Sequence, residues 1–253
     1  MDNFVPYVYL DGHRSACLDS DKDGYVEGIK FFFRFAEIAK KKGVKHIVVM
    51  IHTERNQQKR INSVSKAILR QAVGIGFEGL NFAFNFYGNL DRYNKSIIKY
   101  AVKLGALSKH IGSTTTTIHM MLNYSENWAC DNLDKLTDLP EISSVIRFTK
   151  GHYSGGWIPL KMQKTTLVYV QNPSVSFLWK NEDISKLIDI SFDNWKTISR
   201  VVGQSEYSEN QKKEIKKQRD DNLFIEYDIS SLKQNKTKRI IVFGELGPKI
   251  CEL

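Results

Sequence analysis

The sequence has little cysteine and no long apolar run, and both features argue against particular classes of protein. Its cysteines are Cys17, Cys130 and Cys251; they are widely separated and form no C-x-x-C, which is typical of reduced thiols in a cytoplasmic protein. No apolar run reaches the roughly 18 to 20 residues that span a bilayer, so we expect at most peripheral membrane contact. The N-terminal segment holds acidic residues and no cleavable apolar core, which argues against a signal peptide.

Common catalytic and metal-binding motifs are also missing. There is no G-x-S-x-G, Walker A or G-x-G-x-x-G pattern, which argues against a serine hydrolase, a P-loop enzyme and a nicotinamide enzyme. The six histidines are scattered, and no two are spaced as H-x-x-x-H, so a zinc site is not expected.

The formal net charge of +9 indicates an anionic partner, such as a phosphorylated small molecule, nucleic acid or an acidic membrane surface. Much of the excess lies in Lys40-Lys41-Lys42, in Lys59-Arg60 and in residues 212–219. These runs lack the interleaved aromatic residues of a base-stacking platform, so we do not expect nucleic-acid binding. A solvated surface is the simpler explanation of these runs.

The hydrophobic pattern alternates between strand and helix, without internal repeats. It predicts strands at residues 5–10, 45–51, 80–87, 115–122, 144–148 and 165–171, and helices at residues 28–42, 59–73, 91–104 and 181–195. This alternation predicts an α/β fold with a mostly parallel central sheet flanked by helices. Functional groups in such a sheet gather beyond the carboxyl ends of the strands.

We expect three segments along the chain. Residues 1–204 form the α/β domain, and residues 205–221 are polar and charged, as in a linker or lid. Residues 222–253 form a C-terminal β extension, with a hairpin of strands at 223–229 and 239–243.

The first candidate site motif is Asp11-Gly12-His13-Arg14, directly after the first strand. Glycine allows a sharp turn and close backbone approach, and arginine offers a forked donor for phosphate oxygens. A plain turn with a surface ion pair is the alternative.

The second candidate motif runs from Lys150 to Pro159, after another strand, and is rich in glycine. Backbone amides in such a loop can bind an anion, and Lys150, His152 and Ser154 can add side-chain donors. An ordinary long turn is the alternative.

A third motif, at residues 19–24, matches the opening of a calcium-binding loop. Lys30 stands where such a loop requires a bidentate glutamate. We therefore interpret this segment as an acidic loop that caps the next helix.

In their order along the chain, these segments resemble the cis-prenyltransferase (undecaprenyl diphosphate synthase) superfamily, over residues 5–202. The resemblance rests on Asp11-Gly12, residues 24–44, 46–54, 84–93 and 117–124, Val145-Ile146-Arg147 and Phe177-Leu178-Trp179. Several motifs of chain-elongating members are replaced here, including the one that would fall at residues 52–56. The divergent tuberculosinyl transferase (diterpene synthase) branch is more similar, above all at residues 163–174.

The resemblance implies roles for particular residues. Asp11, Tyr25 and His152 would be catalytic, with Asp11 also a possible ligand of Mg²⁺. The substrate diphosphate would be bound by Gly12, His13, Arg14, Lys150, Gly151 and Ser154. The prenyl pocket would be lined by Phe32, Phe33, Phe84 and Trp157, although plain core packing is the alternative for these four.

The function implied is that of a terpene synthase or prenyltransferase. It would ionise an allylic isoprenoid diphosphate and pass the cation to water or a small nucleophilic acceptor, or release a proton. A homodimer is implied too. The alternative is a non-catalytic partner subunit of an active prenyltransferase, because residues 156–160 resemble a motif of such subunits.

Overall fold

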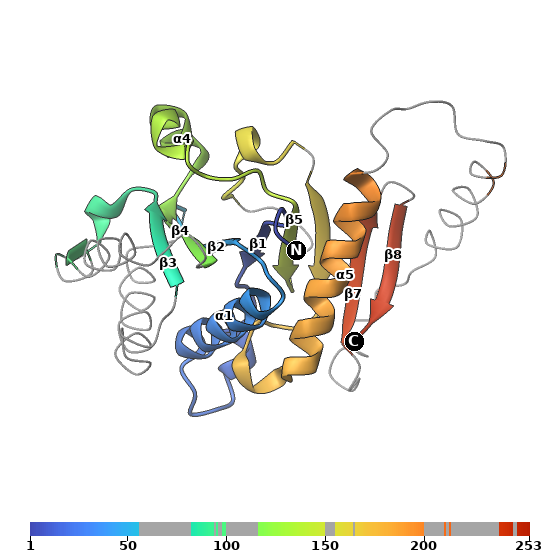
Figure 1. Ribbon diagram of the computed structural model, residues 1–253. Coiled ribbons are helices and arrows are strands. Elements are labelled where there is room, and N and C mark those ends of the chain that lie inside the picture. The colour runs from blue at the N-terminus through green and yellow to red at the C-terminus, as the bar shows by residue number, and fades with distance from the viewer. Residues whose placement is uncertain are drawn as a thin grey trace.

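The computed structural model describes residues 1–55, 82–93, 95, 98–99, 116–149, 155–163, 165–199, 210, 213, 238–244 and 247–253. The described strands form an eight-stranded sheet in the order β3-β4-β2-β1-β5-β6-β7-β8 (Figure 1). Its strands are β1 (Pro6–Tyr9), β2 (His46–Thr53), β3 (Phe82–Tyr87), β4 (Thr116–Tyr124), β5 (Ser144–Phe148), β6 (Thr166–Val170), β7 (Arg239–Gly244) and β8 (Gly247–Glu252). All neighbours from β3 to β6 pair in parallel, so the predicted fold class is confirmed.

Helices cover both faces of this sheet. On one face lie α1 (Gly24–Lys41) and α5 (Asn181–Ser199), which bury a large apolar cluster against the strands. On the other face lies α4 (Glu126–Asp131), with the short helices η4 (Leu133–Leu136) and η5 (Pro159–Lys161). The remaining short helices are η1 (Ser15–Cys17), η3 (Leu90–Arg92) and η6 (Ser176–Leu178). Because both faces are covered, every residue of β1 is buried.

Helix α1 begins one turn earlier than predicted. The Asp23 carboxylate accepts hydrogen bonds from the backbone amides of Tyr25 and Val26, at 2.9 and 3.3 Å, and so caps the helix. The expectation that the acidic loop caps this helix is therefore confirmed. At the other end Gly43 takes a φ of +81°, and the Val44 amide donates to the Ala39 carbonyl at 3.0 Å. This arrangement closes the helix with a left-handed glycine.

The C-terminal hairpin differs from the prediction. The predicted strand at 239–243 is confirmed as β7, but its hairpin partner is β8, which follows it, whereas the predicted partner at 223–229 lies outside the described residues. No strand was predicted at residues 247–252, and β8 begins with glycine and proline, which are uncommon inside strands. β8 can hold this proline because it is an edge strand of the sheet that the described residues form. β7 also pairs antiparallel with β6, so the hairpin continues the central sheet.

Some predicted elements cannot be compared. The helix at 59–73 lies outside the described residues, as do most of the helix at 91–104 and most of the linker at 205–221. Within the described ranges, no helix combines the length and apolar character needed to cross a membrane. Cys17, Cys130 and Cys251 are all free thiols.

Three polar side chains in a row connect strands β2, β4 and β3. His119 Nε2 lies 3.1 Å from His46 Nδ1, and His119 Nδ1 lies 3.2 Å from the Tyr87 hydroxyl. Burial, with a smaller contribution from the neighbouring His46, lowers the pKa of His119 to about 3. Burial lowers the pKa of His46 as well. His119 is therefore neutral in the native state over the physiological range.

The neutral His119 makes stability depend on pH. The unfolded chain gains a proton at this residue near pH 6.5, whereas the native state does so only near pH 3. The free energy of unfolding should fall as the pH drops between these values, by at most about 1.4 kcal/mol per pH unit from this residue. His119→Gln can still hydrogen-bond but cannot titrate, so its stability should fall less steeply. Urea unfolding between about pH 7 and about pH 5 tests this. If the free energy of unfolding fell equally steeply with pH in the two proteins, the prediction would be contradicted.

Candidate active site

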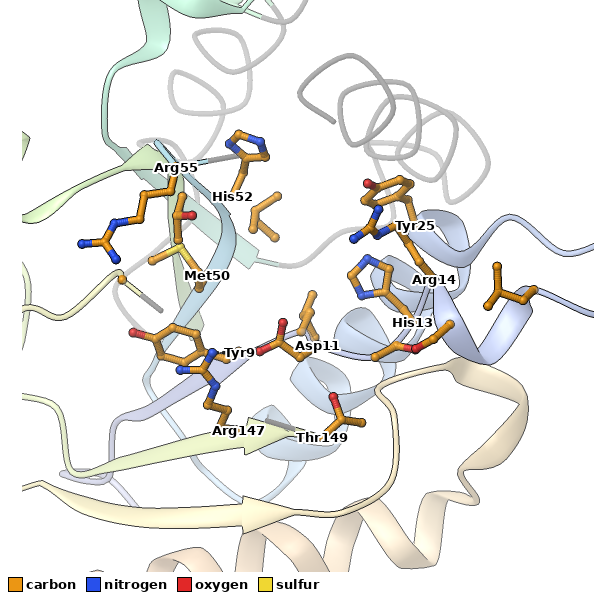
Figure 2. A pocket seen from close by; sticks show the side chains of 17 residues that line it. Tyr9, Asp11, His13, Arg14, Tyr25, Met50, His52, Arg55, Arg147 and Thr149 are labelled. Carbon is orange, nitrogen blue, oxygen red and sulfur yellow. Dashed lines mark hydrogen bonds and ion pairs between the residues drawn. The ribbon is translucent and has the colours of Figure 1, made fainter. Parts of the chain in front are cut away.

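A cavity of about 660 Å³ opens at the carboxyl edge of the sheet, where the adjacent strands β2, β1 and β5 end (Figure 2). Its lining residues come mainly from these three strand ends. They are Tyr9, Leu10, Asp11, Gly12, His13, Arg14, Ser15, Leu18, Tyr25, Met50, Ile51, His52, Thr53, Arg55, Arg147, Thr149 and Gly155. The cavity thus lies where parallel sheets commonly place their ligands.

Positive charge dominates the described lining of this cavity. It contains three guanidinium groups, those of Arg14, Arg55 and Arg147, and a single carboxylate, that of Asp11. Figure 2 shows Asp11 in the middle, with Arg147 on one side and Arg14 on the other. Such a charge distribution favours an anionic ligand.

The turn at Gly12 requires glycine for two reasons. Its φ is +79°, and a Cβ there would lie 2.5 Å from Thr149 Cγ2 and 2.8 Å from Pro173 Cβ. The Asp11 carbonyl accepts hydrogen bonds from the backbone amide and the hydroxyl of Ser174, at 3.1 and 3.0 Å. The segment after β1 is therefore held against the segments after β5 and β6.

Tyr25 joins this turn through His13 and Arg14. The His13 and Tyr25 ring centroids are 5.1 Å apart, and Arg14 Cζ lies 6.0 Å from the centre of the Tyr25 ring. Two glycines of α1 allow this approach. A Cβ at Gly24 would lie 2.6 Å from the His13 carbonyl oxygen, and one at Gly28 would lie 3.3 Å from the His13 ring.

Arg147 is a site residue that sequence reasoning missed as a functional group. Its side chain is only 3% exposed, and Nη2 lies 3.3 Å from Oδ2 of Asp11. Its guanidinium carbon also lies 5.0 Å from the centre of the Tyr9 ring. The available signal was an arginine in the otherwise apolar strand at 144–148, because a buried charge requires a partner.

The wall near Gly155 is fixed by a set of polar groups. The hydroxyls of Tyr7 and Tyr9 both donate to the Gly156 carbonyl at 2.7 Å. Glu126 Oε1 accepts from the amides of Gly156 and Trp157, at 2.8 and 3.1 Å. Burial raises the pKa of Tyr7 well above its ordinary value, so this hydroxyl stays protonated and can donate.

The predicted ligands of the second candidate motif cannot be placed. Lys150, Gly151, His152 and Ser154 lie outside the described residues. The described residues on either side of this segment are Thr149 and Gly155, and both line the cavity. Thr149 has a φ of +59°, a strained conformation for a β-branched residue.

The predicted prenyl-pocket residues lie elsewhere. Phe32, Phe33 and Phe84 are buried in the core between α1 and the sheet, and Trp157 packs against the core on the opposite face. None of them lines the described cavity. The difference arises because an apolar helix face looks the same in sequence whether it packs in a core or lines a pocket. The apolar part of the described lining comes instead from Leu10, Leu18, Met50 and Ile51.

The described residues do not fit the magnesium ion that the resemblance implies. Mg²⁺ in phosphate sites is held by one or two carboxylates together with substrate oxygens. The described lining offers one carboxylate, that of Asp11, and its Oδ2 already lies 3.3 Å from Arg147 Nη2, so a cation bound there would lie close to a fixed positive charge. In the part of the chain that the structure describes, no cluster of three or more His, Cys, Asp or Glu residues could hold a metal ion.

Comparison with solved structures agrees with the fold. No protein-family profile and no curated protein matches the sequence. Lavandulyl diphosphate synthase from Lavandula x intermedia, solved with dimethylallyl diphosphate, has a TM-score of 0.59 at 12% identity, covering 72% of this chain and 94% of that one. The fold resembles that of cis-prenyltransferases.

A second structure extends the comparison. A probable undecaprenyl diphosphate synthase from Campylobacter jejuni has a TM-score of 0.56 at 12% identity, covering 76% of this chain and 96% of that one. Both alignments span nearly the whole of the compared structures, so the resemblance to the cis-prenyltransferase fold is not limited to a local motif.

The packing around Gly12 gives a testable prediction. Gly12→Ala should lower the free energy of unfolding by about 2 to 4 kcal/mol, because it combines a strained φ with overpacking against Thr149 and Pro173. Gly43→Ala is the matched control, since Gly43 has a similar φ of +81° but its Cβ would meet nothing closer than 3.6 Å. This control should lose about 1 to 2 kcal/mol. If urea unfolding showed the same loss of free energy of unfolding in both variants, Thr149 and Pro173 would not restrict the residue at position 12.

Proposed function

We propose that this chain is an isoprenoid-diphosphate enzyme that ionises an allylic diphosphate. The observation that carries the proposal is a cavity lined by three arginines and one carboxylate, beside the left-handed turn at Gly12. Support comes from the fold, and from the neighbour crystallised with dimethylallyl diphosphate.

The diphosphate would bind to the guanidinium groups that line the cavity. Arg14 and Arg55 line it from the ends of different strands, and forked guanidinium groups suit phosphate oxygens. Backbone amides around Gly12 add donors that are already oriented. Lys150, Gly151, His152 and Ser154 remain predicted ligands from the adjoining segment.

Ionisation then follows from charge neutralisation. The bond between the allylic carbon and the bridging oxygen breaks, and its electron pair stays with the diphosphate, where the positive groups stabilise it. The allylic cation that remains would lie near Asp11, whose carboxylate stabilises it, and near the face of the Tyr25 ring.

The cation must then be quenched. It either bonds to an acceptor oxygen or nitrogen that gives up a proton, or loses a proton itself, and Asp11 is the nearby base in either case. Leu10, Met50 and Ile51 offer an apolar wall for the prenyl chain.

Diphosphate release from geranyl, farnesyl and geranylgeranyl diphosphate by the purified chain tests this function, with products identified by mass spectrometry. Release by the chain alone is expected. Release that appears only when an active prenyltransferase is added would instead favour the alternative of a partner subunit.

Asp11→Asn should lower turnover by about 100-fold or more, because it removes the charge beside the reacting carbon. The matched control is Asp189→Asn, which alters an aspartate that is also ion-paired, with Lys42 at 2.8 Å, but lies outside the cavity. This control should keep parental activity. If Asp11→Asn matched the parent on every substrate, the role of Asp11 would be wrong.

A further inference from the structure

The ion pair between Arg147 and Asp11 is built into the sheet. Arg147 is the direct neighbour of Tyr9 in the parallel pairing of β5 with β1. Asp11 follows Tyr9 by two residues and lies within 3.3 Å of the Arg147 guanidinium. The position of the positive charge is therefore set by strand register rather than by a flexible loop.

Neighbouring groups hold this guanidinium in place. The Tyr9 ring lies 5.0 Å from its carbon, and the Tyr9 hydroxyl is itself fixed by the Gly156 carbonyl at 2.7 Å. The Arg147 side chain is 3% exposed, whereas that of Asp11 is 22% exposed. Arginine keeps its charge when buried, so the buried Arg147 guanidinium requires a counter-charge. The Asp11 carboxylate is partly exposed, so it depends less on this partner.

This arrangement bears on how the diphosphate charge is neutralised. A divalent cation bound by Asp11 would come close to the fixed positive charge of Arg147, and like charges at this range repel. The cavity already supplies guanidinium groups from three places in the chain. These groups can bind phosphate oxygens without a bridging metal.

We propose that Arg147 is the built-in counter-charge of Asp11, and that this chain binds its diphosphate substrate without a divalent metal ion. The proposal rests on the proposed function and assigns Arg147 as a positioning residue that acts through Asp11. It replaces the expectation of a magnesium ion at Asp11.

Calorimetric titration with farnesyl thiolodiphosphate, an analogue that ionises very slowly, tests this in the wild-type chain. The dissociation constants measured with EDTA and with magnesium chloride should agree within about threefold. Binding that needs magnesium, with a change of about tenfold or more, would overturn the metal-free proposal but leave the proposed function standing. No binding under either condition would overturn both.

Arg147→Gln and Arg147→Lys separate this role from a merely structural one. Arg147→Gln removes the positive charge, so the titration should become magnesium-dependent, and Mn²⁺ alone should bind, as seen by electron paramagnetic resonance. Asp11→Asn in the same chain should abolish that Mn²⁺ binding. Arg147→Lys keeps the charge and should stay metal-independent.

The two variants also provide the contradicting outcome. If Arg147 had a purely structural role, both substitutions would lower thermal stability. The effect of magnesium on the dissociation constant, here called the metal response, would then be the same in the two variants. Equal metal response in Arg147→Gln and Arg147→Lys would therefore overturn the assignment. If Arg147→Gln does not fold, the wild-type titration decides the question by itself.

Discussion

The turn at Gly12 fixes the positions of the other residues of the site. It is wedged between Thr149 and Pro173, so the chain leaving β1 is fixed to the segments that follow β5 and β6. Only a residue without a side chain can take this place. Once the turn is fixed, Asp11 faces Arg147, and His13 reaches the first turn of α1. A local backbone requirement thus determines where the charged groups of the cavity meet.

The two faces of the sheet contribute differently to this cavity. On the α1 face, Gly24 and Gly28 leave room for His13, and this brings Tyr25 to the rim. On the α4 face, Tyr7, Tyr9 and Glu126 fix the backbone next to Gly155. The cavity is therefore assembled at the end of the sheet by groups from both layers. Such support from packed elements keeps charged side chains in position for a polyanionic ligand.

Much of the architecture follows from sequence pattern, but the partners of buried polar groups do not. Apolar runs located six strands of the parallel sheet to within a few residues. Asp11, Gly12, His13 and Arg14 were predicted because a turn follows a strand, whereas Tyr25 was predicted only from the family resemblance. Arg147 was missed because strand pairing, which sets its partner, is not visible in a single sequence. Phe32 and Phe33 show the converse, since helical spacing marks an apolar face without showing what covers it. Strand β8 was not predicted, and its sequence gives a weak strand signal because it begins with glycine and proline.

In the proposed function, the cavity beside Asp11 binds the diphosphate of an isoprenoid. A crystal structure with bound farnesyl thiolodiphosphate tests it most directly. Both phosphate groups are expected inside this cavity, in contact with Arg14 or Arg55, with the first carbon of the prenyl chain beside Asp11. Phosphate groups bound elsewhere on the molecule, with Arg14 and Arg55 out of reach, would contradict it.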